Sequence, residues 1–243
     1  VRGLAIGAAP QAGGAEAAHA AAYTDAYTAA HDPRWAAAVA ASQGVYFTGG
    51  AQSRLLDALA PGGRASPLLQ AVHALHGRGG VVAGSSSGAA VLSALCFREA
   101  PDLIGALRGT LRDGVEVDRG FGFLAPSLLL DQHFVKRGRI GRLLPLMAAR
   151  GLPLGLGVEE DSAALLQAGT LEVLGRHGVL VADLAPARIE ATAPLALQGA
   201  RLHWLRPGDR MALGDRAVMP AAGARIDPFA PGHRATNPGP AFY

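Results

Sequence analysis

Three consecutive serines between two glycines form the first candidate chemical site in the sequence. Gly84 to Gly88 reads GSSSG, follows the apolar run "VVA" and precedes an alanine-rich stretch. This satisfies G-x-S-x-G with Ser86 at the centre, the pattern of a nucleophile elbow, in which a sharp strand-to-helix turn exposes the central side chain. An ordinary helix cap is the alternative interpretation, since serine caps helices well. Catalysis by Ser86 requires a base within reach of its hydroxyl.

His133 is the histidine that best fits the role of a base. The stretch "LLLDQHF" places it directly after an apolar run, whereas the other histidines lie on alanine- and leucine-rich helices, in the strand-rich end or in the tail. A core histidine is the alternative. The acids Glu159, Glu160 and Asp161 likewise follow the apolar "LGLGV". Three adjacent carboxylates repel one another unless a cation or hydrogen bonds offset the charge, and a solvated loop is the alternative interpretation.

The elements that must position these residues alternate between strand and helix. Apolar runs bounded by glycine or polar residues predict strands at 4–9, 44–50, 81–84, 126–134 and 152–161. Helical spacing or alanine-rich composition predicts helices at 15–30, 35–42, 66–78, 89–97 and 137–151. The alternation predicts an α/β fold with a mostly parallel central sheet flanked by helices, and with ligands beyond the carboxyl ends of the strands.

The carboxyl-terminal third has a different texture. After Asp161, short strand-like runs such as "LEVL", "VLVADL" and "RLHWL" are separated by turn residues, which predicts an antiparallel extension of the sheet. We expect one α/β domain over residues 1–219, followed by an extended or disordered tail over 220–243, which is rich in proline and glycine.

Composition excludes several classes of function. The chain has 243 residues, is 50% hydrophobic and carries a net charge of +3, with Lys136 as its lone lysine. No apolar run approaches the roughly 18 to 20 residues of a membrane-spanning helix, so we expect no membrane role. The sequence lacks the basic stripe with interleaved aromatic residues that is typical of nucleic-acid-binding proteins, so we do not predict nucleic-acid binding. Cys96, the single cysteine, lies in an apolar setting and is expected to be a core residue. We expect a cytoplasmic location, with a secreted form that has lost a leader as the alternative.

Four stretches carry a resemblance that extends over most of the chain. "YFTGGAQSRLL", "GSSSGAA", "GFGFLAPSLLLDQHFVKRGRIGRLL" and "LGLGVEEDSAALL" resemble, in order, the motifs of the cyanophycinase family, serine peptidases of the clan that also holds the aspartyl dipeptidases. Ser85 and Ser87 stand where the family has threonine and alanine. The family fold is class I glutaminase-like or flavodoxin-like. Little lies between "LAIGAAP" and "GVYFTGG", so an early strand or two of that fold is expected to be absent or cut away.

The resemblance implies a role for each candidate site residue. It implies a catalytic triad of Ser86, His133 and Glu160. The elbow pattern itself places the backbone N–H of Ser87 where it can donate to an oxyanion, and the resemblance adds the backbone of Gly50 to that oxyanion site. The resemblance further implies that substrate contacts Gln52, Asp131 and Gln132.

The segment after His133 adds three arginines, Arg137, Arg139 and Arg142. In a helix, Arg139 and Arg142 lie three apart on one face and can converge on one carboxylate, whereas Arg137 lies about 200° from Arg139. Guanidinium groups suit carboxylates, and the family's substrates are rich in aspartate, so we predict substrate binding by these arginines. A solvated helix face is the alternative.

The implied activity is hydrolysis of cyanophycin, a polyaspartate with arginine on its β-carboxyls, to β-aspartyl-arginine dipeptides. The resemblance implies an acyl-enzyme, a homodimer, and no metal or organic cofactor. One alternative is an exopeptidase for short aspartyl or β-aspartyl peptides, and another is a catalytically silent binding protein of the same fold. An unrelated α/β-hydrolase is disfavoured, because its acid precedes its histidine, whereas Glu160 follows His133.

Overall fold

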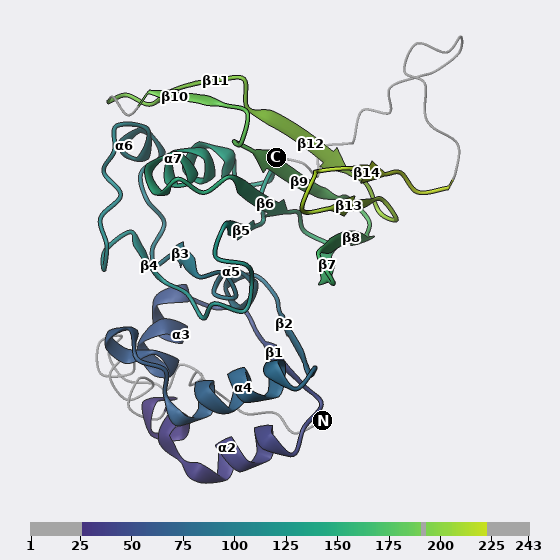
Figure 1. Ribbon diagram of the computed structural model, residues 1–243. Coiled ribbons are helices and arrows are strands. Elements are labelled where there is room, and N and C mark those ends of the chain that lie inside the picture. Colours follow the sequence, from purple (N-terminus) through teal and green to yellow (C-terminus); the bar gives the residue numbers. More distant parts are fainter. Residues whose placement is uncertain (1–25, 191–192, 223–243) are drawn as a thin grey trace.

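The computed structural model of the protein describes residues 26–190 and 193–222 (Figure 1). The amino-terminal half contains, in order, α2 (Pro33–Ala40), β1 (Gly44–Phe47), α3 (Gln52–Leu59), a 3₁₀ turn (Pro61–Gly63), α4 (Pro67–Gly77), β2 (Val81–Gly84), α5 (Ser87–Ala90), β3 (Leu95–Phe97), α6 (Leu103–Leu107) and β4 (Val117–Arg119). The second half contains β5 (Leu128–Gln132), α7 (Ile140–Arg150), β6 (Leu154–Val158), β7 (Ser162–Gln167), β8 (Thr170–Gly175), β9 (Val179–Asp183), β10 (Arg188–Glu190), β11 (Ala196–Gln198), β12 (Arg201–Leu205), β13 (Arg210–Ala212) and β14 (Val218–Met219).

A parallel pair of strands covered by helices forms the amino-terminal part. β1 and β2 pair in parallel, with Phe47 opposite Gly84 at their carboxyl ends. Pro67 opens α4, and the side chain of Ser66 caps it by accepting a hydrogen bond from the Leu69 N–H. The apolar residues of α4 are buried at the helical spacing expected from the sequence, and they pack with residues of α3 and β1 in one core cluster.

The central sheet has the order β12-β9-β6-β5. β5 and β6 are parallel, whereas β6 with β9 and β9 with β12 are antiparallel. All five residues of β5 are buried, and α7 packs on this sheet through Leu143, Leu146 and Met147. The expected mostly parallel arrangement is not confirmed. The chain returns from β6 to β9 through the β7–β8 pair rather than through a crossover helix, so β9 lies antiparallel to β6.

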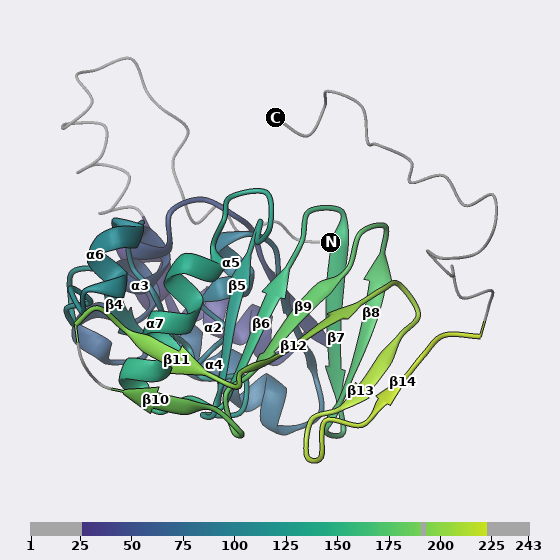
Figure 2. The ribbon, with the colours of Figure 1, turned by 90° about the horizontal axis from the view of Figure 1, so that it is seen from above.

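A second sheet, with the order β14-β13-β8-β7, is antiparallel throughout, and Figure 2 shows its strands beside those of the central sheet. Leu171 and Val173 of β8 pack in one cluster with Leu156 of β6 and Val181 of β9. The antiparallel extension expected after Asp161 is therefore present.

Two predicted helices differ from the structure. The helix expected over 89–97 is reduced to the single turn α5, because residues 95–97 instead pair antiparallel with β4 as strand β3. Pairing with β4 here overrides the predicted helix, and Cys96 and Phe97 are residue types with only moderate helix propensity. The helix expected over 137–151 begins only at Ile140, since Gly138 has φ +60° in the preceding turns, but it ends at Gly151 in the left-handed conformation, as expected.

Some expectations lie outside the described residues. They are the strand over 4–9, most of the helix over 15–30, and the tail beyond residue 222. Within the ranges that are described, no helix is both long enough and apolar enough to cross a bilayer.

Candidate active site

The turn after β2 holds Ser86 in a rare backbone conformation. Its φ is 51° and its ψ is −123°, a region that residues with a side chain seldom adopt. The flanking glycines permit the turn, since a Cβ on Gly84 would lie 2.3 Å from the carbonyl oxygen of Gly88, and one on Gly88 would lie 2.2 Å from that of Phe47. A side chain at Gly49 would press on Ser86 itself, with the two Cβ atoms 3.0 Å apart. The GSSSG segment thus forms a strand-to-helix elbow, although α5 is too short to contribute a substantial helix dipole.

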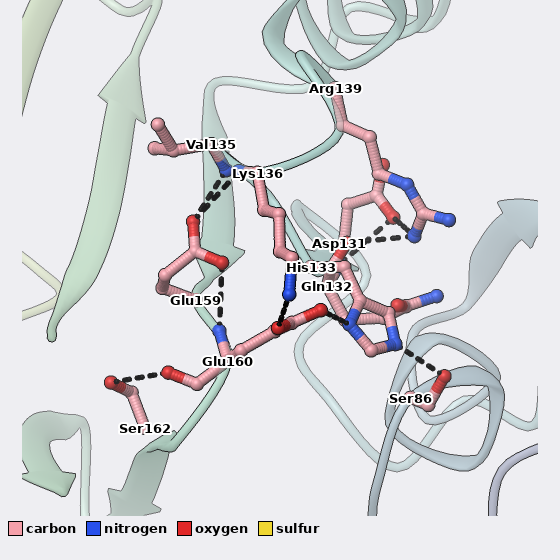
Figure 3. A network of polar contacts seen from close by, with 10 residues as sticks. All are labelled: Ser86, Asp131, Gln132, His133, Val135, Lys136, Arg139, Glu159, Glu160 and Ser162. Carbon is pink, nitrogen blue, oxygen red and sulfur yellow. Dashed lines mark hydrogen bonds and ion pairs between the residues drawn. The ribbon is translucent and has the colours of Figure 1, made fainter. Parts of the chain in front are cut away.

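Ser86, His133 and Glu160 form a continuous hydrogen-bond path (Figure 3). The Oγ of Ser86 lies 2.8 Å from Nε2 of His133, and Nδ1 of His133 lies 2.8 Å from Oε1 of Glu160. With Glu160 ionised, Nδ1 carries the proton that it donates to the carboxylate, which leaves Nε2 to accept from the serine hydroxyl. The arrangement can therefore take a proton from Ser86 as that oxygen attacks an electrophile.

The parallel pairing of β5 and β6 places the histidine and the acid side by side. Gln132 lies opposite Val158 in the register, so His133 and Glu160 follow neighbouring strand ends. His133 and Asp161 both have positive φ, 48° and 51°, so the backbone turns sharply on either side of this contact. The side chains of His133 and Glu160 are 23% and 30% exposed, which leaves the path accessible from solvent.

Two further charged residues, Lys136 and Glu159, surround this contact (Figure 3). The ammonium of Lys136 lies 2.5 Å from Oε2 of Glu160, and it lowers the pKa of that carboxyl below its ordinary value, with His133 as the second cause. The carboxylate of Glu159 accepts hydrogen bonds from the backbone N–H groups of Val135, Lys136 and Glu160. Sequence reasoning assigned no role to either residue. Two features of the sequence could have indicated this contact: Lys136 is the single lysine, and three adjacent acids need a cation nearby.

Gly50, Gln52 and Ser87 lie together beside the elbow. The hydroxyl of Ser87 is 2.5 Å from the carbonyl oxygen of Gly50 and 2.9 Å from Oε1 of Gln52. Among the described residues, the backbone N–H groups of Gly50 and Ser87 donate to no acceptor, and their binding of an oxyanion stays a prediction. The side chain of Ser87 thus ties Gln52, at the start of α3, to the elbow.

Asp131 and Arg142 do not lie where a substrate reaches. Asp131 is fully buried, and its carboxylate receives the Nε and Nη2 of Arg142, each at 2.6 Å, and Nη1 of Arg139 at 3.1 Å. Arg142 is 3% exposed and lies over the ring of Phe97. The two guanidinium groups converge on one carboxylate as expected, but that carboxylate belongs to Asp131. The expectation of direct substrate contact by Asp131 and Arg142 is therefore corrected, because burial and mutual pairing leave them no free surface.

The remaining predicted substrate residues keep some access. Arg137 is exposed, and the side chain of Arg139 is 12% exposed. Gln132 is 5% exposed, and its buried Oε1 has no hydrogen-bond partner among the described residues. Their contact with a substrate stays a prediction. Within the same residues, no group of three or more His, Cys, Asp or Glu side chains is arranged to hold a metal ion.

The fold is shared with a known peptidase. A crystal structure of a peptidase from an acI-B1 Actinobacterium superposes with a TM-score of 0.53 and 21% sequence identity, over 76% of this chain and 66% of that one. At this identity the likeness shows a common α/β fold. No family model matches the sequence.

Curated relatives give a closer assignment. The chain is 35% identical over 194 residues to cyanophycinases of Trichormus variabilis and of a Nostoc species, and 35% identical over 174 residues to that of Synechococcus elongatus. The chain belongs to the cyanophycinase family. These alignments cover 76%, 76% and 68% of this chain but only 62%, 62% and 51% of the respective relatives, so the chain spans less than two thirds of their length.

Proposed function

We propose that the protein is a serine peptidase that hydrolyses cyanophycin to β-aspartyl-arginine dipeptides. The observation that carries the proposal is the path of two 2.8 Å hydrogen bonds from Ser86 through His133 to Glu160. A serine in a strained turn, a histidine that accepts its proton and an acid that orients the histidine are the parts that acyl transfer needs. The choice of cyanophycin as the substrate is inferred from the family to which the chain belongs.

Acylation begins when Oγ of Ser86 attacks the carbonyl carbon of the scissile bond while Nε2 of His133 takes the hydroxyl proton. The imidazolium that forms is stabilised by the carboxylate of Glu160, which stays ionised. The developing oxyanion accepts hydrogen bonds from the N–H groups of Gly50 and Ser87. His133 then gives its proton to the leaving amine, which departs and leaves an ester on Ser86.

Deacylation repeats these roles with water as the nucleophile. His133 takes a proton from the water as it attacks the ester, and it returns the proton to Oγ of Ser86 as the second product leaves. In this proposal Gln52 orients the substrate, which its contact with Ser87 beside the elbow supports. Arg137 and the exposed edge of Arg139 are the cations available for substrate carboxylates, since Arg142 is fully occupied by Asp131.

Mass spectrometry of products after incubation with cyanophycin tests the proposal. We expect the β-aspartyl-arginine dipeptide from the wild-type protein and none from Ser86→Ala. Ser85→Ala is the matched control, because the Ser85 side chain makes no hydrogen bond within the described residues, and we expect it to remain active. Intact polymer together with turnover of short aspartyl dipeptides would favour the exopeptidase. Unchanged hydrolysis by Ser86→Ala would remove that serine from the mechanism.

We further propose a homodimer, as the family resemblance implies, and a cytoplasmic location. Light scattering after size-exclusion chromatography gives the subunit number, and a monomer at assay concentration would contradict the first point. Cell fractionation tests the second.

A further inference from the structure

The carboxylate of Glu160 is held from two sides. Oε1 accepts from His133, and Oε2 lies 2.5 Å from the ammonium of Lys136 (Figure 3). The Glu160 side chain is 30% exposed. Without a second contact, its carboxylate would rotate about the terminal torsion and replace its hydrogen bond from His133 with one from water. Because the two bonds use different oxygens, holding Oε2 also fixes the direction in which Oε1 faces the imidazole.

The position of Lys136 is itself fixed by the neighbouring acid. Oε2 of Glu159 accepts from the backbone N–H of Val135 at 2.7 Å and from that of Lys136 at 3.2 Å, while Oε1 accepts from the N–H of Glu160 at 2.8 Å. Glu159 therefore ties the turn after His133 to the end of β6. The lysine side chain then crosses the same gap in the opposite direction, so the two segments are joined by two separate contacts.

Other nearby cations are committed elsewhere or make no contact with this acid. Arg139 and Arg142 bind Asp131, and the guanidinium of Arg137 makes no hydrogen bond or ion pair with a described residue. Among the described residues, Lys136 is thus the cation that contacts Glu160, and it is also the largest cause of the lowered pKa of that carboxyl. An ionised Glu160 keeps His133 in the tautomer that can accept the Ser86 proton.

We propose that Lys136 is a positioning residue that acts through Glu160 to align His133 on Ser86. The inference rests on the proposed serine-peptidase function. Lys136 does not touch the reacting atoms in this scheme. It binds Oε2 of Glu160 and favours the ionised form of that carboxylate. A lysine with this task should affect the rate of the chemical step rather than the binding of substrate.

The test compares Lys136→Gln and Lys136→Arg with the wild-type protein in two assays. One is the kcat and KM for cyanophycin, and the other is the rate constant for covalent labelling of Ser86 by a fluorophosphonate probe. For Lys136→Gln we expect kcat and the labelling rate to fall about fivefold with KM unchanged, a size set by the partial exposure of the ion pair. Lys136→Arg should stay within about twofold of wild type because it keeps the charge and a donor.

Arg188→Gln is the matched control. It also removes one positive charge, from an exposed ion pair with Glu190 in β10, and we expect no change in either rate. A double-mutant cycle gives the mechanism: in a Glu160→Gln background, Lys136→Gln should cause no further loss, because the acid through which it acts is already gone. If Lys136 only supported the fold, Lys136→Gln would lower the rates by the same factor in the wild-type and Glu160→Gln backgrounds.

Three results would overturn the inference: wild-type rates for Lys136→Gln, an equal loss in Lys136→Arg, or an increase in KM alone, which would mean that the lysine contacts substrate. The labelling assay separates this inference from the proposed function, because it needs an activated serine but not cyanophycin. Wild-type protein that labels at Ser86 and leaves cyanophycin intact would refute the substrate, and the relative labelling rates would still decide the role of Lys136. Wild-type protein that does not label would overturn both.

Discussion

The guanidinium of Arg142 makes two hydrogen bonds of 2.6 Å to the carboxylate of Asp131, and the side chains of the two residues are 4% and 0% exposed. Arg139 adds a third contact and also donates to the carbonyl oxygen of Gln132 at 2.7 Å. This cluster holds the last residues of β5, directly before His133. The buried Asp131–Arg142 pair, with the added contact from Arg139, therefore fixes the end of the strand that leads into His133.

Removal of the acid from this cluster should destabilise the whole fold. Asp131→Ala leaves two guanidinium groups next to one another without their counterion, one of them fully buried, and we expect a loss of about 3–5 kcal/mol in the free energy of unfolding. Urea denaturation followed by circular dichroism measures it. The matched control is Asp113→Ala, which breaks an exposed ion pair with Arg150 and should cost at most about 1 kcal/mol. Equal losses in both variants would contradict the structural role of the cluster.

The close approach of backbone segments at the elbow predicts a second contrast. A Cβ on Gly88 would lie 2.2 Å from the carbonyl oxygen of Phe47, whereas one on Gly77 at the end of α4 has nothing within 4 Å. We expect Gly88→Ala to lower the free energy of unfolding by about 1–3 kcal/mol, since β1 and the turn must separate. Gly77→Ala should leave stability equal or slightly higher. Thermal unfolding of both variants decides it, and a stable Gly88→Ala protein would show that the turn tolerates a side chain.

The acid of the site should make a pH-dependent contribution to stability. The ammonium of Lys136, and then His133, hold the pKa of Glu160 in the folded protein below its ordinary value of 4.5. A carboxyl of this kind stabilises the fold while ionised, so its contribution is complete above the unfolded pKa and is lost as the pH falls below that value. The difference in unfolding free energy between wild type and Glu160→Gln should therefore shrink as the pH falls below 4.5. Urea titrations from neutral pH to about pH 3 measure this difference, and a constant gap would argue against the ion pair.

The single cysteine should be chemically silent in the folded protein. Cys96 is fully buried in β3, and burial raises the pKa of its thiol to about 12, with Asp118 as the next cause. Because the thiolate is the reactive form, we expect no reaction with a disulfide reagent at neutral pH until the chain unfolds. Labelling with and without denaturant tests this expectation, and rapid labelling of the native protein would place Cys96 at the surface.

Local patterns in the sequence were sufficient for several features. The GSSSG turn, the spacing of apolar residues in α4, the burial of Cys96 and the antiparallel strands after Asp161 all depend on neighbours a few residues away or on simple periodicity. Strand ends are also visible in the sequence, where apolar runs give way to polar residues. These transitions are enough to predict that Ser86, His133 and Glu160 follow the ends of three separate strands.

The tertiary structure alone decided which charges meet. The partners of Asp131 come from 8 and 11 residues along the chain, and Lys136 reaches an acid 24 residues away, so no local periodicity encodes these pairs. The antiparallel position of β9 and the pairing of residues 95–97 as β3, where a helix was predicted, have the same origin, since pairing between distant strands outweighs local propensity. Sequence therefore determined the types of residue at the site and their order, whereas long-range packing determined that two arginines support the fold and that a lysine supports the acid.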